Sequence, residues 1–198
     1  MAFVVTLTGP SQCGKSTIRK FFMDKNNSKF NPVIFKKYTT RSPRATDDDV
    51  ICVKDMPAEC DLVYEQYGVR YGIRFDDLYE HLEHGESPII VLNDVRAVED
   101  VRTALWPQVV SLFLYRQPPD LQKFIDEESK RAVKGVSEEE IRVSAQSRFD
   151  KAKSIYRIYI ENIHLFDNVI LNTGDLCYTE LQVNHVVQML SQKIKELK

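Results

Sequence analysis

The feature that most constrains this chain is a glycine-rich segment close to its start. Residues 9–16 match the pattern G-x-x-x-x-G-K-[ST], which Lys15 and Ser16 complete. An apolar, β-type run over residues 3–7 precedes the match, and an amphipathic helical pattern over 17–23 follows it. In this setting backbone N–H groups wrap a triphosphate, the lysine reaches its β and γ oxygens, and the serine hydroxyl can ligate Mg²⁺. We therefore predict a nucleoside triphosphate site made of Gly9, Ser11, Gln12, Cys13, Gly14, Lys15, Ser16 and Thr17, with Ser16 as the metal ligand.

Hydrophobic periodicity predicts that strands and helices alternate along the chain. A phosphate loop after the first strand, followed by such alternation, is typical of a parallel sheet covered by helices on both faces. The pattern shows no repeat and no linker, so we expect one α/β domain over residues 1–198. The predicted strands cover 2–8, 33–38, 50–54, 61–66, 87–92, 109–115 and 169–172, and the predicted helices 15–25, 75–83, 94–105, 118–132, 137–162 and 181–197.

The composition of the chain indicates which classes of partner it can bind. The formal net charge is −2, so no global positive field would recruit nucleic acid or an anionic membrane. The 4 cysteines are scattered without metal-ligand spacing, which is typical of reduced thiols, and Cys13 in the phosphate loop fits best as a small packing residue. The chain starts directly with a strand pattern and has no apolar run of membrane length. We therefore expect a cytoplasmic protein without a leader, acting on a small molecule.

A second group of residues suggests a site for a phosphate monoester. Arg41 and Arg44 lie three residues apart between turn residues, directly after a predicted strand. Guanidinium forks suit bidentate capture of a phosphate, although two arginines alone can equally be a surface pair. Farther on, Glu65 and Tyr71 flank a turn. The carboxylate could accept hydrogen bonds from a base or sugar, and Tyr71 could bind a phosphate or stack on a base, but each alone is more often a structural strand residue.

Together these motifs resemble those of a guanylate kinase, in the same order from about residue 3 to 175. The resemblance rests on the phosphate loop, the segment Thr-Thr-Arg-x-Pro-Arg at 39–44, the glutamate six residues before Tyr71-Gly72, Pro-Pro-x-Leu at 118–121, and Phe-Asp-Asn-Val-Ile-Leu-Asn at 166–172. It implies a P-loop NTPase core with a small mixed α/β insertion for the monophosphate and a helical lid. It also implies ATP-dependent, Mg²⁺-assisted phosphorylation of GMP or dGMP. The implied boundaries are 1–35, 88–125 and 146–198 for the core, about 36–87 for the acceptor region and about 126–145 for the lid.

The resemblance also implies roles for single residues. Arg41 and Arg44 would hold the acceptor's phosphate with help from Tyr71, and Glu65 would accept hydrogen bonds from the guanine edge. Asp94 would face the acceptor or hold a water on Mg²⁺. Further candidates are Asn172 for the ATP site and, with Lys15, the lid cations Arg131, Arg142 and Arg148 for neutralising the transferred phosphoryl group.

Three departures from the family pattern bear on the substrate. Lys37 stands where the family has a serine that reads the guanine carbonyl, and could donate to that carbonyl or to a different group. Where the family has a phosphate-binding tyrosine in the pattern Gly-x-Asp-Tyr, this chain has Asp49-Val50. Ser144 aligns with a lid arginine, so Arg142 or Arg148, one turn away, would have to substitute. A modified nucleotide as acceptor stays open.

Two alternatives remain at the level of sequence. The stretches 67–73 and 93–97 are similar to ribose 1,5-bisphosphate phosphokinases, which phosphorylate a base-free sugar phosphate. Glu65 and the arginine pair favour a nucleotide instead. Guanylate kinase-like domains also occur as non-catalytic interaction modules, but those usually have a damaged phosphate loop, and this one is intact. We expect a small-molecule nucleotide as the partner and a monomer or homodimer as the assembly.

Overall fold

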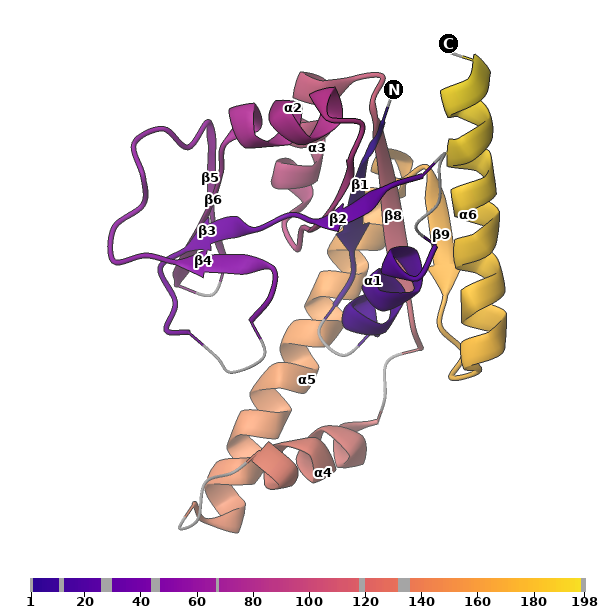
Figure 1. Cartoon of the computed structure of the whole chain (residues 1–198). Coiled ribbons are helices and arrows are strands. Elements are labelled where there is room, and N and C mark those ends of the chain that lie inside the picture. Colours follow the sequence, from indigo (N-terminus) through magenta and orange to yellow (C-terminus); the bar gives the residue numbers. More distant parts are fainter. Residues whose placement is uncertain are drawn as a thin grey trace.

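The glycine-rich segment follows the central strand of a five-stranded sheet (Figure 1). The computed structural model describes residues 2–10, 13–25, 30–43, 47–66, 68–117, 120–131 and 136–196. All neighbouring strands in this core sheet are parallel, and Val5 aligns with Ile89 on one side and Val110 on the other. The strand order is β2 (Pro32–Ile34), β7 (Ser87–Val91), β1 (Val4–Thr8), β8 (Val109–Tyr115) and β9 (Asn168–Leu171).

Helices cover both faces of the core sheet, as the alternation predicts. On one face α1 (Lys15–Met23) and α6 (Leu176–Glu196) bury a core that includes Leu7, Ile18 and Val187. On the other face the covering helices are α2 (Phe75–Glu83), α3 (Val95–Leu105) and the second half of α5 (Glu138–Glu161), followed by the short 3-10 helix η1 (Ile163–Leu165). Strands buried on both faces read as continuous apolar runs, which explains why the sequence pattern was sufficient to predict this layer. The predicted α/β class is confirmed.

A second, four-stranded sheet stands beside the core sheet (Figure 1). Its order is β4 (Val50–Cys52), β3 (Lys37–Thr39), β6 (Val69–Ile73) and β5 (Leu62–Gln66); β3 and β4 are parallel and the other pairs are antiparallel.

Two expectations about this region were wrong. The single strand predicted over 33–38 is two short strands, because the chain passes from the core sheet to the second sheet at residues 35 and 36. Residues 69 and 70, expected in a turn, belong to β6, because Gly68 at φ +75° places the turn before them.

A helical hairpin projects from the core below the two sheets in Figure 1. It consists of α4 (Leu121–Arg131) packed along the first half of α5. A small core of Phe124, Ala145 and Ala152 joins the two helices. Ser137 and Glu140 cap the start of α5 reciprocally, as a capping box does. Along the described stretches of the chain, no helix has both the length and the apolar character that crossing a membrane requires.

The last helix begins five residues earlier than the hydrophobic pattern indicated. Asp175 accepts hydrogen bonds from the backbone N–H groups of Cys177 and Tyr178, at 2.9 and 3.2 Å. An aspartate in this place satisfies the first orphan amides of a helix, so the helix can start at Leu176 although its first turn is exposed. The periodicity of buried residues could not reveal this start.

Candidate active site at the carboxyl edge of the core sheet

The parallel arrangement brings the ends of five strands to one edge of the core sheet. Beyond β1 lies the glycine-rich loop, beyond β7 lie Asn93 and Asp94, and beyond β9 lies Asn172. Beyond β2 the chain crosses directly into the second sheet. In open α/β sheets ligands bind at this carboxyl edge, because loops of different strands converge there.

The glycine-rich loop has a shape that its glycine requires. Gly14 has a φ of +100°, and a Cβ on it would lie 2.5 Å from Nδ2 of Asn172. The same Asn172 amide donates to the carbonyl oxygen of Cys13 at 2.9 Å. This hydrogen bond therefore links the loop to the end of β9, 159 residues away in sequence. Ser11 and Gln12, predicted in this loop, lie outside the described residues.

Lys15 places a positive charge over the loop. Its ammonium donates to the carbonyl oxygens of Gly9 and Pro10, both at 2.7 Å. Burial lowers the pKa of this ammonium, while the Cys13 thiol, 3.9 Å away, works in the opposite direction. Burial raises the pKa of Cys13 itself, which keeps it a neutral thiol and supports the packing interpretation.

The first turn of α1 is open to a ligand. Ser16 and Thr17 are exposed there, and the N-cap is Gly14, which has no side chain to accept from the first amides. A helix start of this kind favours an anion. In the described ranges no three His, Cys, Asp or Glu side chains gather as a metal site. An exposed serine hydroxyl such as that of Ser16 is a ligand that Mg²⁺ accepts, since this ion uses few protein ligands and keeps waters and substrate phosphates around it.

A cavity of about 660 Å³ adjoins the loop on the side of Asn172. Its volume suits a nucleoside-sized ligand. Two of its cations, Lys123 from α4 and Lys153 from α5, were not singled out from the sequence, because nothing in their local pattern distinguishes them from solvated helix residues. The lining residues include Tyr115, Arg116, Lys123, Phe149, Lys153 and Asn172.

One face of the second sheet turns toward the core site. Tyr64 and Tyr71 are cross-strand partners whose rings stack with centroids 5.3 Å apart. The Lys37 ammonium lies 5.2 Å from the centroid of the Tyr71 ring, and Thr39 shares this face. Burial raises the pKa of Tyr64, and the negative charges of Asp94 and Asp49 add to this. Tyr64 was missed in sequence reasoning, because only the strand register places it beside Tyr71.

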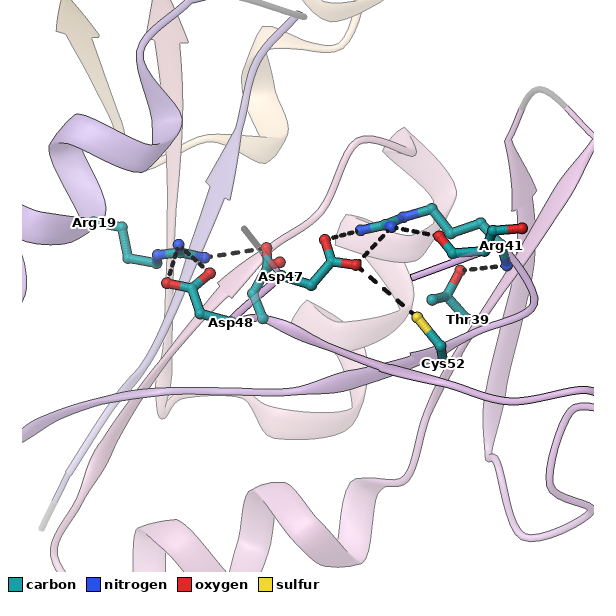
Figure 2. Close-up of polar contacts among 8 residues, drawn as sticks. Arg19, Thr39, Arg41, Asp47, Asp48 and Cys52 are labelled. Atoms are coloured by element: carbon teal, nitrogen blue, oxygen red, sulfur yellow. Dashed lines mark hydrogen bonds and ion pairs between the residues drawn. The ribbon is translucent and has the colours of Figure 1, made fainter. Parts of the chain in front are cut away.

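Arg41 grips a carboxylate in a fork-to-fork geometry (Figure 2). Its two terminal nitrogens donate to the two oxygens of Asp47 at 2.8 and 2.5 Å, and one also donates to the carbonyl oxygen of Ser42 at 3.0 Å. The carboxylate raises the pKa of this guanidinium. A guanidinium can bind a phosphate through the same two N–H groups, so this geometry is compatible with the anion fork predicted at Arg41. Arg44, its predicted partner, is outside the described part of the chain.

A second arginine ties the acceptor region to the helix behind the phosphate loop. Arg19 on α1 is buried, and it forms ion pairs with Asp48 at 2.5 Å and Asp49 at 3.1 Å (Figure 2). The run Asp47–Asp49 thus joins Arg41 on one side and Arg19 on the other. No sequence motif predicted this link, because Arg19 and Asp48 are 29 residues apart.

Glu65 does not lie with the other predicted acceptor residues. It is exposed and pairs across the hairpin with Arg70, whereas its neighbour Tyr64 pairs with Tyr71. Successive strand residues point to opposite faces, so Glu65 and Tyr71 cannot both line the face that holds Lys37. The spacing of six residues suggested proximity, but the turn between the two strands reverses which positions share a face.

Two polar residues follow β7 at the core edge. Asp94 caps α3 by accepting from the Ala97 N–H at 3.0 Å, and it is close enough to Tyr64 to influence its pKa. Asn93 has a buried side-chain oxygen for which the described residues offer no hydrogen-bond partner. Its backbone oxygen accepts from Tyr159 at 2.8 Å and Gln66 at 3.1 Å, which fastens the second sheet and α5 to this edge.

The predicted lid arginines have different surroundings. Arg148 forms an ion pair with Glu128 across the α4–α5 hairpin, and Ser144 also donates to Glu128, at 3.0 Å. Arg142 is exposed and lines a groove between α4 and α5 that is separate from the cavity beside Asn172. The side chain of Arg131 is not among those that the structure describes.

Comparisons with known proteins agree with this architecture. No family model matches the chain. A protein named guanylate kinase from Aster yellows witches'-broom phytoplasma (strain AYWB) is 26% identical over 179 residues, covering 85% of this chain and 78% of the relative. The crystal structure of guanylate kinase from Anaplasma phagocytophilum superimposes with a TM-score of 0.61 over 95% of this chain and 85% of that one, at 18% identity.

Proposed function

We propose that this chain, which belongs to the guanylate kinase-like family, transfers the γ-phosphoryl group of ATP to a nucleoside monophosphate. GMP, dGMP or a modified relative is the proposed acceptor. The observation that supports the proposal is an ionic link between the two candidate phosphate sites. Lys15 starts helix α1, and Arg19 on the same helix pairs with Asp48 and Asp49, next to the Asp47 carboxylate that Arg41 holds.

The donor would lie along the core edge. Backbone amides from Gly14 to Thr17 and the Lys15 ammonium would hold its β and γ phosphates. The cavity beside Asn172 would take the adenosine, with Tyr115 and Phe149 supplying apolar surface. Mg²⁺, when bound, neutralises charge on the β and γ oxygens, and Ser16 would be its protein ligand.

The acceptor would lie on the inner face of the second sheet. Arg41 would exchange the Asp47 carboxylate for the acceptor's phosphate, and Tyr71 would line the site beside it. Arg44, outside the described residues, keeps its proposed place as the second fork. Asp94 would face the acceptor from the core. Glu65 would have to contact the base from the strand's outer face, which makes it the weakest of the proposed contacts.

Chemistry in this site would be in-line phosphoryl transfer. Such transfers need positioning and charge neutralisation more than covalent participation by the protein. Lys15 would stay on the γ-phosphoryl group, and an anionic acceptor phosphate needs no general base. Closure of the α4–α5 hairpin would exclude water and bring a lid cation, Arg131, Arg142 or Arg148, to the transferred group. For Arg148 this requires leaving Glu128.

The comparisons lend no support to the two alternatives, a ribose 1,5-bisphosphate phosphokinase and a non-catalytic interaction module. A cytoplasmic location and a monomeric or dimeric state belong to the same proposal as the kinase activity.

A coupled assay of ADP release tests the proposal. The acceptors are GMP, dGMP, the other ribo- and deoxyribonucleoside monophosphates, and ribose 1,5-bisphosphate. We expect ADP release that depends on an added monophosphate. In Lys15→Ala the rate of ADP release should fall by at least about 10²–10³-fold, with an unchanged Tm. Release with the sugar bisphosphate alone would reassign the acceptor. If none of these acceptors supports ADP release, the non-catalytic interaction module would be the remaining interpretation.

A further inference from the structure

Lys37 is a buried cation at the junction of the two sheets. It belongs to β3, only 5% of its surface is exposed, and its ammonium donates to the carbonyl oxygen of Val91 at the carboxyl end of β7. The second sheet thus sends a positive charge to the edge of the core sheet. A buried charge costs free energy unless it has partners, so its surroundings are informative.

The hydrogen bonds of Lys37 leave room for a ligand. An ammonium has three N–H donors, and the described residues supply one acceptor, the Val91 oxygen. The aromatic face of Tyr71 lies 5.2 Å from the nitrogen and offers a weak further contact. Buried donors without acceptors are rare in proteins, so the donors that the described residues leave unused are available to a ligand oxygen.

The charges around Lys37 indicate what that oxygen carries. Lys15, Arg41 and Arg19 all lie close enough to disfavour its charged form, and Asp49 favours it. Lys37 therefore stands within electrostatic reach of both the phosphate-loop lysine and the proposed acceptor fork. Arg41 and Arg19 are paired with the carboxylates of Asp47–Asp49, so the excess positive charge of this region comes from Lys15 and Lys37. That excess charge would hold an anionic oxygen better than a neutral carbonyl, because attraction to a formal charge is stronger in a buried site.

We infer that Lys37 binds a phosphate oxygen of the acceptor, between Lys15 and Arg41, and does not read the guanine carbonyl. The inference rests on the proposed function and assigns a specificity-determining role within it. Lys37 then makes the site select for the phosphate with little regard to the oxygen at C6 of the base. Glu65, which would read the opposite part of a guanine, lies on the other face of the sheet and is consistent with this assignment.

Binding measurements separate phosphate from carbonyl recognition. Calorimetry would give Kd for GMP and for 2-aminopurine riboside 5′-monophosphate, which lacks the C6 oxygen. The proteins are wild type, Lys37→Met, Lys37→Arg and the exposed neighbour Lys36→Met. We expect Lys37→Met to weaken both ligands equally, by roughly 10- to 100-fold, as loss of a charged hydrogen bond does. Lys37→Arg should restore most of the affinity, and Lys36→Met should change neither Kd.

The pH profile gives a readout that a purely structural lysine would not move. Burial lowers the pKa of Lys37 to about 8, and the charges of Lys15, Arg41 and Arg19 act in the same direction against Asp49. A phosphate monoester is already a dianion above its second pKa of about 6. Affinity should therefore fall from pH 7 to pH 9 in wild type and fall less in Lys37→Arg. Any change in the charge of Lys15 is common to both proteins, so the difference between the two profiles isolates Lys37.

Each result decides the inference. A loss confined to GMP, or a wild type that does not bind the 2-aminopurine ligand, would assign Lys37 or its site to the base and overturn it. Unchanged Kd values in Lys37→Met with an unchanged Tm would overturn it as well. Failure of the proposed function is distinguishable, because then neither monophosphate would bind to wild type or stimulate ADP release.

Discussion

Single side chains decide how ready the acceptor site is to bind an anion. Asp47 takes the two N–H groups of Arg41 that a phosphate would need. In the proposed acceptor site this carboxylate would hold the guanidinium in a binding geometry and would also compete with the acceptor for it. Both side chains are mostly shielded from solvent, with 13% of each exposed, so the interaction is stronger than a surface ion pair.

Asp47→Asn should favour the acceptor. The amide keeps the shape of the side chain but loses its charge, so the acceptor's phosphate no longer has to displace a carboxylate. We expect KM for the monophosphate to fall severalfold, with kcat and KM for ATP unchanged in steady-state assays. A raised KM for the monophosphate would show that Asp47 acts by positioning Arg41.

Gly14→Ala should damage the donor site selectively. The alanine would have to adopt φ +100°, which is strained for an L residue. Its methyl group would also collide with Asn172. We expect KM for ATP to rise at least tenfold, because the loop amides lose their arrangement. Gly85→Ala is the matched control. Gly85 has φ +74°, but a methyl group there would meet nothing within 4 Å, so its variant should lose about 1 kcal/mol of stability and keep its KM for ATP. Equal effects on KM would contradict a specific role of the loop.

At the scale of elements, apolar packing and ion pairs both help to hold the second sheet to the core, beside the hydrogen bonds of Gln66 and Lys37. Leu62 and Ile73 of the second sheet pack into the hydrophobic core that α2 shares with the first sheet. Near β4, the ion pairs of Arg19 with Asp48 and Asp49 hold it to α1. Helix α1 also carries Lys15, so this ionic link couples the position of the second sheet to the proposed donor site.

Arg19→Met should loosen that link. The methionine keeps the apolar part of the buried side chain but leaves the two carboxylates without their partner. We expect the free energy of unfolding to fall by about 1–3 kcal/mol, the scale of charged hydrogen bonds. Hydrogen exchange should accelerate in β3 and β4 more than in β1. Lys20→Met, on the exposed side of the same helix, should leave both measurements within error. Uniform acceleration over the whole chain would indicate general destabilisation without a specific link.

At the scale of the whole molecule, Lys37 lies where the two sheets meet, and its burial opposes folding. The pKa of its ammonium falls from 10.5 to about 8 on folding. Below pH 8 both the folded and unfolded states are protonated, and the folded state bears the full cost of the buried charge. Between pH 8 and 10.5 the folded protein releases the proton while the unfolded chain still binds it, so this group makes stability rise with pH.

Lys37→Met should therefore stabilise the ligand-free protein. At pH 7 we expect a gain on the order of 1–3 kcal/mol in chemical denaturation, because a buried charge is replaced by an apolar chain of similar size. The increase in stability from pH 8 to 10 should shrink to the part that Lys15 contributes. A stabilised variant with weakened acceptor binding is the usual sign of a residue retained for function. A destabilised variant would show that the ammonium is needed for the junction itself.

The sequence by itself determined the layer structure and the place of the glycine-rich loop between β1 and α1. Both depend on local information: the glycines and lysine of the loop lie within eight residues, and strands buried on both faces show as unbroken apolar runs. The position of Arg41 in a turn directly after β3 was also predictable, because the turn and the strand are adjacent in sequence.

Only the tertiary structure decided which distant residues share the site. The face of Glu65 depends on the register between β5 and β6. The start of β6 and the division of residues 32–39 between two sheets depend on strand pairing. The partners of Arg41 and Arg19 come from the acidic run, and the charges around Lys37 come from α1 and from the segment between β3 and β4. Burial and charge at these positions are properties of contacts between segments far apart in the chain, and no local pattern of residue types encodes them.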